Sequence, residues 1–395
     1  MAVAPHYDDS IRVRPADAGD LEAMRRVGTR AFNCNALDWY TETPLVGETA
    51  DGRVVSALAL TLGPLYWGGA EIPASAVGGV ATDPSEQGKG YAGGMMVATV
   101  HHMRELGLAV CPLWPFSFRY YRKFGWELTC MDRAVDLWPN MLRAIGETPD
   151  GVRSAAREDA PGMHAAHTRA ARLTNGQSVR SEAWWAEQSD AFYANALVHE
   201  DGAGTIDGYA LYEGQDRPYG QGKRYRVQEL QAADLAVQRK LLAAVADLPD
   251  IVEAHVVLPA DALLLDLAPE RLIVQQPMRL MIRVLDVGRA LEHLKPDADA
   301  SGRIAFEVRD WIVSRDKPIT VTATIEGGHV DVKPGCAVEP VRCGITTFAR
   351  LYSGGLSIGR ACALGLVDAA PSGAHSALEA ITGGRAPFRS DKEPG

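Results

Sequence analysis

The fold of this chain is decided by one stretch: Val80-Ala81-Thr82-Asp83-Pro84-Ser85-Glu86-Gln87-Gly88-Lys89-Gly90-Tyr91-Ala92-Gly93. It starts as the end of an apolar strand, turns at Pro84, and passes through glycines into a helix. Glycines let the backbone turn tightly and bring successive N–H groups close to a ligand, and the helix start adds the positive end of its dipole. The stretch therefore predicts an anion cradle that suits a pyrophosphate.

The glycine spacing Gly88-x-Gly90-x-x-Gly93 also matches the fingerprint of dinucleotide-binding folds. In those folds the first glycine follows its strand directly. Here the residues from Asp83 to Gln87 intervene, and Pro84 cannot extend a strand ladder. The residues therefore disfavour a dinucleotide site.

The stretch resembles the acetyl-CoA loop of the GNAT acetyltransferases. The match comprises a strand end at Val80 and Thr82, a proline two residues on, and Gln87-Gly88-Lys89-Gly90-Tyr91-Ala92 in the pattern Gln/Arg-x-x-Gly-x-Gly/Ala. The resemblance implies acetyl-CoA as co-substrate and an α/β (α+β) fold of mixed sheets with flanking helices. The cofactor-binding residues that it implies are Val80, Ala81, Thr82, Gly88, Lys89, Gly90, Tyr91, Ala92, Gly93, Phe116 and Ser117.

A second motif, Tyr121-Arg122-Lys123-Phe124-Gly125-Trp126, resembles the closing segment of GNAT domains and places Tyr121 at the family's proton donor. A tyrosine with its ordinary pKa of about 10 is protonated at neutral pH and can protonate a departing thiolate. Tyr120 fails this spacing by one residue, so we expect it in the core or on the surface. Just before the motif, Pro115-Phe116-Ser117 breaks a buried strand, and a split between neighbouring strands there would admit the pantetheine arm.

A chain of 395 residues is longer than a single hydrophobic core usually supports, so two or three domains are expected. Residues 151–285 repeat the strand and helix order of residues 1–150 but lack a glycine-rich loop. Two further segments extend the resemblance to the enhanced-intracellular-survival (Eis-like) acetyltransferases: Arg283-Val284-Leu285-Asp286-Val287 and Thr347-Phe348-Ala349-Arg350-Leu351-Tyr352-Ser353-Gly354-Gly355. That family implies an active GNAT domain at 1–150, a degenerate GNAT domain at 151–285 and a sterol-carrier-like domain at 286–395.

Catalysis also needs a base, because an amine substrate arrives mostly as ammonium. In the resembled family the C-terminal carboxylate takes this role, which implies Gly395 as proton acceptor here. The tail is more polar than the usual apolar end of family members. Glu393 or Asp391 could replace the terminal carboxylate, and the tail could also fray.

Composition narrows the function classes. A net charge of −10 argues against nucleic-acid binding and weakly favours cationic ligands, although it equally suits a solubility surface. Six scattered cysteines without a Cys-x-x-Cys pair indicate neither disulfides nor a zinc site and fit a cytoplasmic protein. We expect no membrane partner, and the resemblance implies a homo-oligomer, a hexamer in the family.

The expected activity is transfer of an acetyl group to a primary amine, either of a small cationic molecule (aminoglycoside-like or polyamine) or of a lysine side chain. The alternative is a non-catalytic protein that senses CoA or carries an apolar ligand in its C-terminal domain. The aromatic residues Phe32, Trp39 and Tyr40 lie in the part of the chain that often forms the wall of the acceptor pocket in GNAT domains. We expect no metal at His101-His102 or at His164 and His167, and we interpret Trp184-Trp185 as core.

Overall fold

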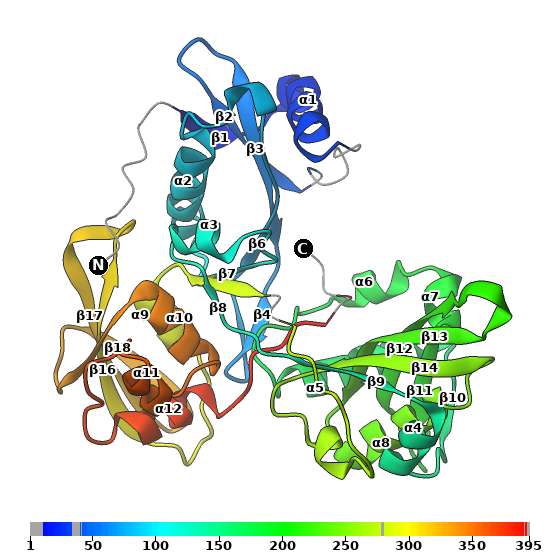
Figure 1. The fold of residues 1–395 in the computed structure, drawn as a ribbon. Coiled ribbons are helices and arrows are strands. Elements are labelled where there is room, and N and C mark those ends of the chain that lie inside the picture. The colour runs from blue at the N-terminus through cyan, green and yellow to red at the C-terminus, as the bar shows by residue number, and fades with distance from the viewer. Residues whose placement is uncertain (1–10, 34–39, 41, 278–279, 391, 393–395) are drawn as a thin grey trace.

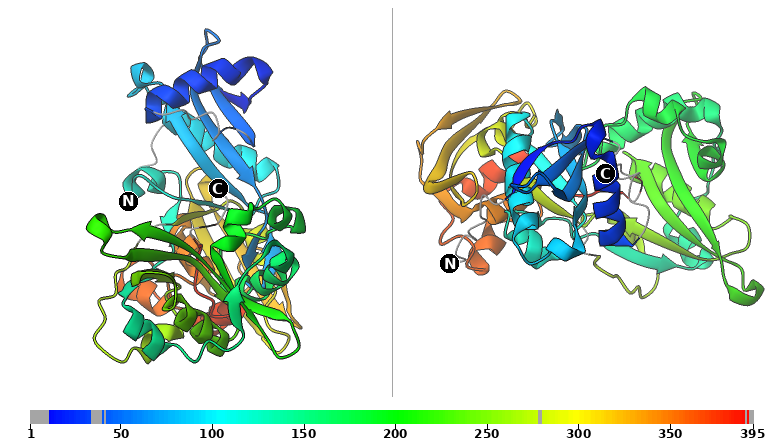
Figure 2. Two further views of the ribbon diagram at one scale, coloured as in Figure 1. Left: turned by 90° about the vertical axis from the view of Figure 1, so that its right-hand side faces the viewer. Right: turned by 90° about the horizontal axis from the view of Figure 1, so that it is seen from above.

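The computed structural model describes residues 11–33, 40, 42–277, 280–390 and 392. It shows three domains, and the first lies between the other two when the molecule is seen from above (Figure 1 and Figure 2, right). Each domain has its own sheet, and helices cover the sheets. The expected fold class, with mixed sheets and flanking helices in all three parts, is confirmed.

The first domain has a four-stranded antiparallel sheet in the order β1-β2-β3-β6. Helix α2 packs on it through buried Met96, Val100 and Met103, the face that the sequence periodicity predicts. The elements are β1 (Arg12–Pro15), η1 (Ala18–Asp20), α1 (Leu21–Phe32), β2 (Thr43–Glu48), β3 (Val54–Leu62), β4 (Leu65–Trp67), β5 (Ala70–Ile72), β6 (Ser75–Thr82), η3 (Pro84–Glu86), α2 (Tyr91–Glu105), β7 (Val110–Leu113), α3 (Phe118–Arg122) and β8 (Glu127–Leu128).

The second domain has a six-stranded sheet in the order β10-β11-β12-β13-β14-β9. Its helix α8 is capped by the side chain of Asp234, which accepts from the N–H of Ala236, in place of a glycine loop. The elements are β9 (Arg133–Leu137), α4 (Pro139–Ile145), β10 (Val152–Ser154), η4 (Arg157–Asp159), α5 (Ala160–Ala171), α6 (Glu182–Ala186), α7 (Asp190–Ala194), β11 (Ala196–Glu200), β12 (Ile206–Asp216), η5 (Pro218–Gly220), β13 (Lys223–Ala232), α8 (Leu235–Val245), β14 (Ile251–Leu258) and η6 (Leu263–Leu267).

The third domain packs helices against a four-stranded sheet in the order β18-β17-β16-β19. It docks on the first domain where the ring of Trp67 stacks on Tyr352 with ring centres 5.2 Å apart. The elements that follow β14 and η6 are β15 (Met281–Val284), α9 (Val287–Glu292), β16 (Gly302–Asp310), β17 (Ser314–Glu326), β18 (His329–Pro334), β19 (Pro340–Gly344), α10 (Ile345–Ser353), α11 (Ile358–Ala363) and α12 (Ala374–Thr382).

Two strands cross between the domains, so the sheets do not divide at residues 150 and 285 as expected. Strand β9 leaves the first domain and pairs with β14 at the edge of the second sheet. Strand β15, which follows the second domain, inserts between β7 and β8 (Figure 1). An apolar strand pattern does not specify its partner, which is why the sequence did not predict this exchange.

No helix in the described part of the chain is long and apolar enough to span a bilayer.

Candidate active site

The glycine loop has the backbone geometry of an anion cradle. Gly88 and Gly90 have φ of 82° and 86°, and Gly90 is the N-cap of α2. A Cβ atom at either glycine would meet no heavy atom within 4 Å, so the loop is open to a ligand. Because the first N–H groups of a helix have no intrahelical acceptor, those of Tyr91 and Ala92 are available to an anion at the N-terminal end of α2.

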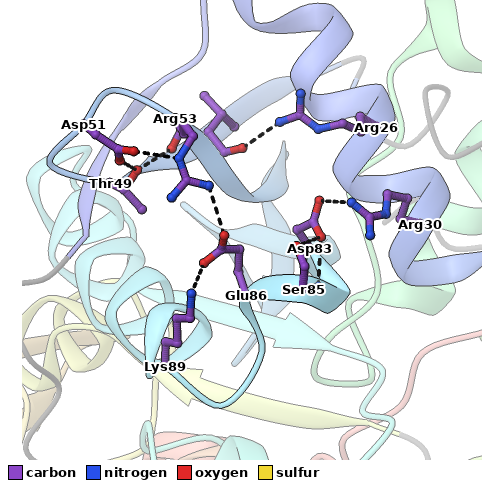
Figure 3. A network of polar contacts seen from close by, with 10 residues as sticks. Arg26, Arg30, Thr49, Asp51, Arg53, Asp83, Ser85, Glu86 and Lys89 are labelled. Carbon is purple, nitrogen blue, oxygen red and sulfur yellow. Dashed lines mark hydrogen bonds and ion pairs between the residues drawn. The ribbon is translucent and has the colours of Figure 1, made fainter.

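Charged side chains brace the outer side of the loop (Figure 3). The carboxylate of Glu86 accepts from Lys89 Nζ at 2.6 Å and from Arg53 Nη1 at 3.0 Å, and both cations lower its pKa. Asp83, which caps η3, pairs with Arg30 of α1 at 2.9 Å. Lys89, a predicted cofactor contact, therefore has its ammonium engaged by Glu86.

The expected split between neighbouring strands lies between β6 and β7. One isolated parallel bridge joins Ala74, the residue before β6, to Val110 of β7, and no ladder pairs the two strands beyond it among the described residues. In β6 a bulge places Gly79 and Val80 opposite Leu58 of β3. Gly79 has φ of 59°, and its carbonyl accepts from the hydroxyl of Tyr40 at 2.9 Å. A bulge turns backbone N–H groups away from the ladder, so they can meet a ligand carbonyl in the split.

Tyr121 lies on α3, which follows β7. Ser117 caps this helix by accepting from the N–H of Tyr120 at 3.3 Å, and the ring of Phe116 lies 5.4 Å from that of Tyr121. Tyr121 is 4% exposed, and burial raises its pKa to about 12. The raised pKa keeps the phenol protonated at neutral pH. Its hydroxyl has no hydrogen-bond partner among the described residues, so its proton is available to a ligand. Phe116, by contrast, is 76% exposed.

A cavity of about 270 Å³ lies on the other face of the split. Alternation along the strands puts Val77 and Cys111 in the core beneath α2, and Ala76 and Pro112 in the cavity wall. Its lining comes from the first domain, from the part of the second domain just before and at the start of α6, and from the tail: Glu42, Thr61, Leu62, Gly63, Pro64, Leu65, Ala74, Ala76, Pro112, Ser178, Val179, Arg180, Ser181, Trp184 and Arg389.

The C-terminal tail reaches this cavity, crossing from the third domain toward the second (Figure 1). The N–H of Phe388 donates to the carbonyl of Asn175 at 2.8 Å, and Arg389 lies over the ring of Trp114 at 5.0 Å. Arg389 and Ser390 are buried, so the tail is packed at least to residue 390. The predicted proton acceptor Gly395 and its substitutes Glu393 and Asp391 lie outside the described residues.

The chain matches three family models in order. An acetyltransferase (GNAT) domain matches residues 12–129, a second GNAT domain matches residues 176–284, and a sterol carrier protein domain matches residues 287–390. The chain belongs to the GNAT acetyltransferases. The predicted order of an N-terminal GNAT domain, a second GNAT-like domain and a sterol-carrier-like domain is thereby confirmed.

Relatives of this GNAT acetyltransferase span most of its length. It is 28% identical over 368 residues to an uncharacterized N-acetyltransferase of Streptomyces griseus, covering 83% of this chain and 82% of the relative. A second uncharacterized N-acetyltransferase, from Streptomyces avermitilis, is 26% identical over 348 residues, or 80% of this chain and 81% of the relative.

Solved structures share its fold. A GCN5-related N-acetyltransferase from Anabaena variabilis superposes with a TM-score of 0.82 at 18% identity, over 96% of this chain and 99% of that one. Eis1 from Mycobacterium abscessus superposes with a TM-score of 0.77 at 19% identity, again over 96% and 99% of the two chains. The Eis-like resemblance therefore holds for the fold.

The second GNAT domain differs at the place where the first has its split. Strands β13 and β14 pair in parallel from Lys223 to Val227. The sequence there has no glycine-rich loop, and α8 begins directly after Asp234. The loss of a cofactor site from this domain stays a prediction.

Several other predicted residues find ordinary roles. His167 is buried, and its two ring nitrogens face the hydroxyl of Tyr209 at 3.1 Å and the carbonyl of Ser178 at 3.0 Å. Trp185 is core as expected, whereas Trp184 lines the cavity. Trp39 lies outside the described residues.

The cavity residues Glu42, Arg180 and Arg389 were missed by the sequence analysis. They come from three distant segments and belong to no local motif, so no spacing in the sequence marks them.

Proposed function

We propose that this GNAT protein is an acetyl-CoA-dependent N-acetyltransferase that acts on a primary amine. One observation carries the proposal: the split between β6 and β7 has the glycine cradle beyond the end of β6 and Tyr121 just after the end of β7. A cradle for pyrophosphate and a split for the pantetheine arm would hold acetyl-CoA, and a buried phenol supplies the general acid for thioester aminolysis.

The chain's residues divide the reaction between them. The amine nitrogen attacks the thioester carbonyl, and a backbone N–H at the bulge of Gly79 and Val80 stabilises the charge that develops on the carbonyl oxygen. When the carbon–sulfur bond breaks, Tyr121 donates its proton to the thiolate, and the second proton that leaves the attacking nitrogen restores the phenol. The amine must first lose a proton from its ammonium form, and the C-terminal carboxylate of Gly395 is our candidate acceptor for it.

The cavity supports a small amine, or the end of a lysine side chain, as acceptor. Its volume of about 270 Å³ lies just below the range of typical ligand pockets, and Glu42 is a carboxylate in its wall. Wall residues such as Leu62, Leu65 and Trp184 would pack against an alkyl chain. Among the acceptor classes expected from the sequence, polyamines and lysine side chains fit these dimensions better than a bulky aminoglycoside.

The alternative function, carriage of an apolar ligand, finds less support in the third domain. The rings of Phe306 and Phe348 lie 5.0 Å apart in its interior, and those of Phe348 and Tyr352 lie 5.9 Å apart. Tyr352 in turn packs on Trp67 of the first domain. These aromatic side chains occupy the apolar interior in which a ligand would be carried, and they continue the packing into the first domain.

A thiol-release assay tests the proposed function. Purified protein and acetyl-CoA are mixed, in separate reactions, with spermidine, with a lysine-containing peptide and with an aminoglycoside. We expect release of CoA with at least one amine, with mass spectrometry showing one acetyl group on that amine. Absence of amine-dependent release across the panel, with acetyl-CoA bound as measured by calorimetry, would favour the CoA-sensing alternative.

A further inference from the structure

The second GNAT domain contains a backbone bulge at the position that matches the bulge of the first. In the first domain, Gly79 and Val80 of β6 lie opposite Leu58. In the second, β13 pairs Glu229 with Leu211 and Val227 with Tyr212, which leaves Gln228 as the extra residue. Each bulge lies in the strand that leads into the helix at the cofactor position, α2 or α8. The two bulges therefore occupy equivalent places, although the second domain has no cofactor loop.

Beside the second bulge, Glu229 forms a fully buried ion pair. Its carboxylate accepts from Arg180 Nη2 at 2.5 Å and from Arg180 Nη1 at 2.9 Å, and neither side chain is exposed. The hydroxyl of Tyr209 donates to Glu229 at 2.8 Å, and His167 contacts that hydroxyl in turn. Glu229 stays ionised here: burial alone would raise its pKa, but the charge and hydrogen bonds of Arg180 hold it down to about 2.

The same carboxylate holds the C-terminal tail. The hydroxyl of Ser390 donates to Glu229. One residue earlier, Arg389 Nη1 donates to the carbonyl of Gly176 at 3.0 Å, and its guanidinium lies over Trp114. The guanidinium of Arg180, which pairs with Glu229, lies 4.5 Å from the ring centre of Trp184 in the cavity wall. The ion pair thus connects the tail to the wall of the acceptor cavity.

We propose that the second GNAT domain uses the bulge of β13 to anchor the C-terminal tail, and that Glu229 is a positioning residue for the acceptor cavity. A buried ion pair is weak support for stability by itself, because desolvation of both charges offsets their attraction. It is, however, directional, and its carboxylate supplies a fixed acceptor for one hydroxyl of the tail. The former cofactor domain therefore acts on the reaction through the chain end that it holds.

Hydrogen exchange of the tail tests the anchor without any activity. The variant is Ser390→Ala, which removes the tail's hydroxyl and leaves the Arg180–Glu229 pair intact. We expect exchange in the peptide containing Phe388 to accelerate by about tenfold or more, because a hydrogen bond to a charged acceptor is lost. Ser390→Thr keeps the hydroxyl and should restore protection. The matched control is Ser376→Ala, which removes an exposed hydroxyl bonded to the carbonyl of Gly373 in the third domain.

Kinetics then test the positioning role, which rests on the proposed function. In Ser390→Ala we expect KM for the amine to rise about fivefold or more, since Arg389 shifts in the cavity wall, while calorimetry shows unchanged acetyl-CoA affinity. A loss confined to acetyl-CoA affinity would contradict the proposal. If the wild-type protein transfers no acetyl group, the proposed function fails, yet the exchange experiment still decides whether the anchor exists.

Two further variants test whether Glu229, and not other contacts, holds the tail. Glu229→Gln should accelerate exchange in the same peptide, and a thermal melt reports whether the second domain remains folded. The paired substitution Glu229→Leu with Arg180→Met removes both charges, avoids an uncompensated cation and is expected to fold. Unchanged tail exchange in both the paired variant and Ser390→Ala would overturn the anchor.

Discussion

Trp311 of the third domain donates its indole N–H to the carbonyl of Lys123 at 2.8 Å. Lys123 is the C-cap of α3, the helix that carries Tyr121. Beside this contact, Arg283 pairs with Asp310 at 2.6 Å, and both side chains are buried. The turn between β16 and β17 therefore holds the end of the helix on which the proposed proton donor lies.

The substitution Trp311→Phe should slow acetyl transfer without abolishing it. The ring is kept but the hydrogen bond to Lys123 is lost, so α3 gains freedom and Tyr121 is less well placed. We expect turnover to fall by about three- to tenfold, with acetyl-CoA affinity unchanged. Trp138→Phe, at an exposed tryptophan, is the control. Equal turnover in the two variants would show that the third domain does not position Tyr121.

The substitution Tyr121→Phe should keep acetyl-CoA binding and reduce turnover by about a hundredfold or more, as expected when a general acid is removed. Tyr120→Phe is the matched control, since Tyr120 is the neighbouring residue and fails the family spacing. Steady-state rates and calorimetric affinities decide the matter. Normal turnover in Tyr121→Phe together with slow turnover in Tyr120→Phe would reverse the assignment.

The raised pKa of Tyr121 makes a separate prediction about pH. Burial lifts this pKa to about 12, so the phenol keeps its proton well above the ordinary tyrosine pKa of about 10. The rate constant at saturating amine should therefore not decline between pH 8 and about pH 10. A decline in that range that disappears in Tyr121→Phe would mean that the phenol ionises too early for this role.

The substitution Gly90→Val should abolish acetyl-CoA binding. Gly90 has φ of 86°, which a β-branched residue rarely adopts, and the new side chain would project into the open cradle. Gly220→Val is a close control, because Gly220 also has positive φ and open space around it but lies in the β12–β13 hairpin of the second domain. Calorimetry with CoA should show loss of affinity only in the first variant.

Truncation of the tail separates its packing from its chemistry. Chains that end at Glu393 or Asp391 keep the buried Arg389 and Ser390, whereas a chain that ends at Phe388 loses both. If the terminal carboxylate of Gly395 is the base, all three should bind acetyl-CoA and lose most transfer activity. Full activity in the chain that ends at Phe388 would exclude both the terminal base and a role of the tail in the cavity.

Local motifs made much of the first domain predictable. The glycine loop, α2 and the helix of Tyr121 are each specified by residues close together in the sequence, and the structure places them around one split. The ion pair of Lys89 with Glu86 was harder to predict from the sequence, because the two side chains meet only after the loop has folded. The cavity and the tail anchor could not be predicted, since Arg180 and Glu229 meet only in the folded second domain and Ser390 joins them only when the tail packs on that domain.

The exchange of β9 and β15 has a consequence for how the protein is made. The sheet of β7 and β8 lacks its central strand until residues 281–284 have left the ribosome, although most of the first domain emerges much earlier. Until then, β7 and β8 have unpaired edges, which are prone to wrong pairing and aggregation. The first domain therefore cannot complete its folding on the ribosome until the second domain has been synthesised. For the same reason, fragments expressed separately from residues 1–150 and 151–285 would each lack a strand of their sheets.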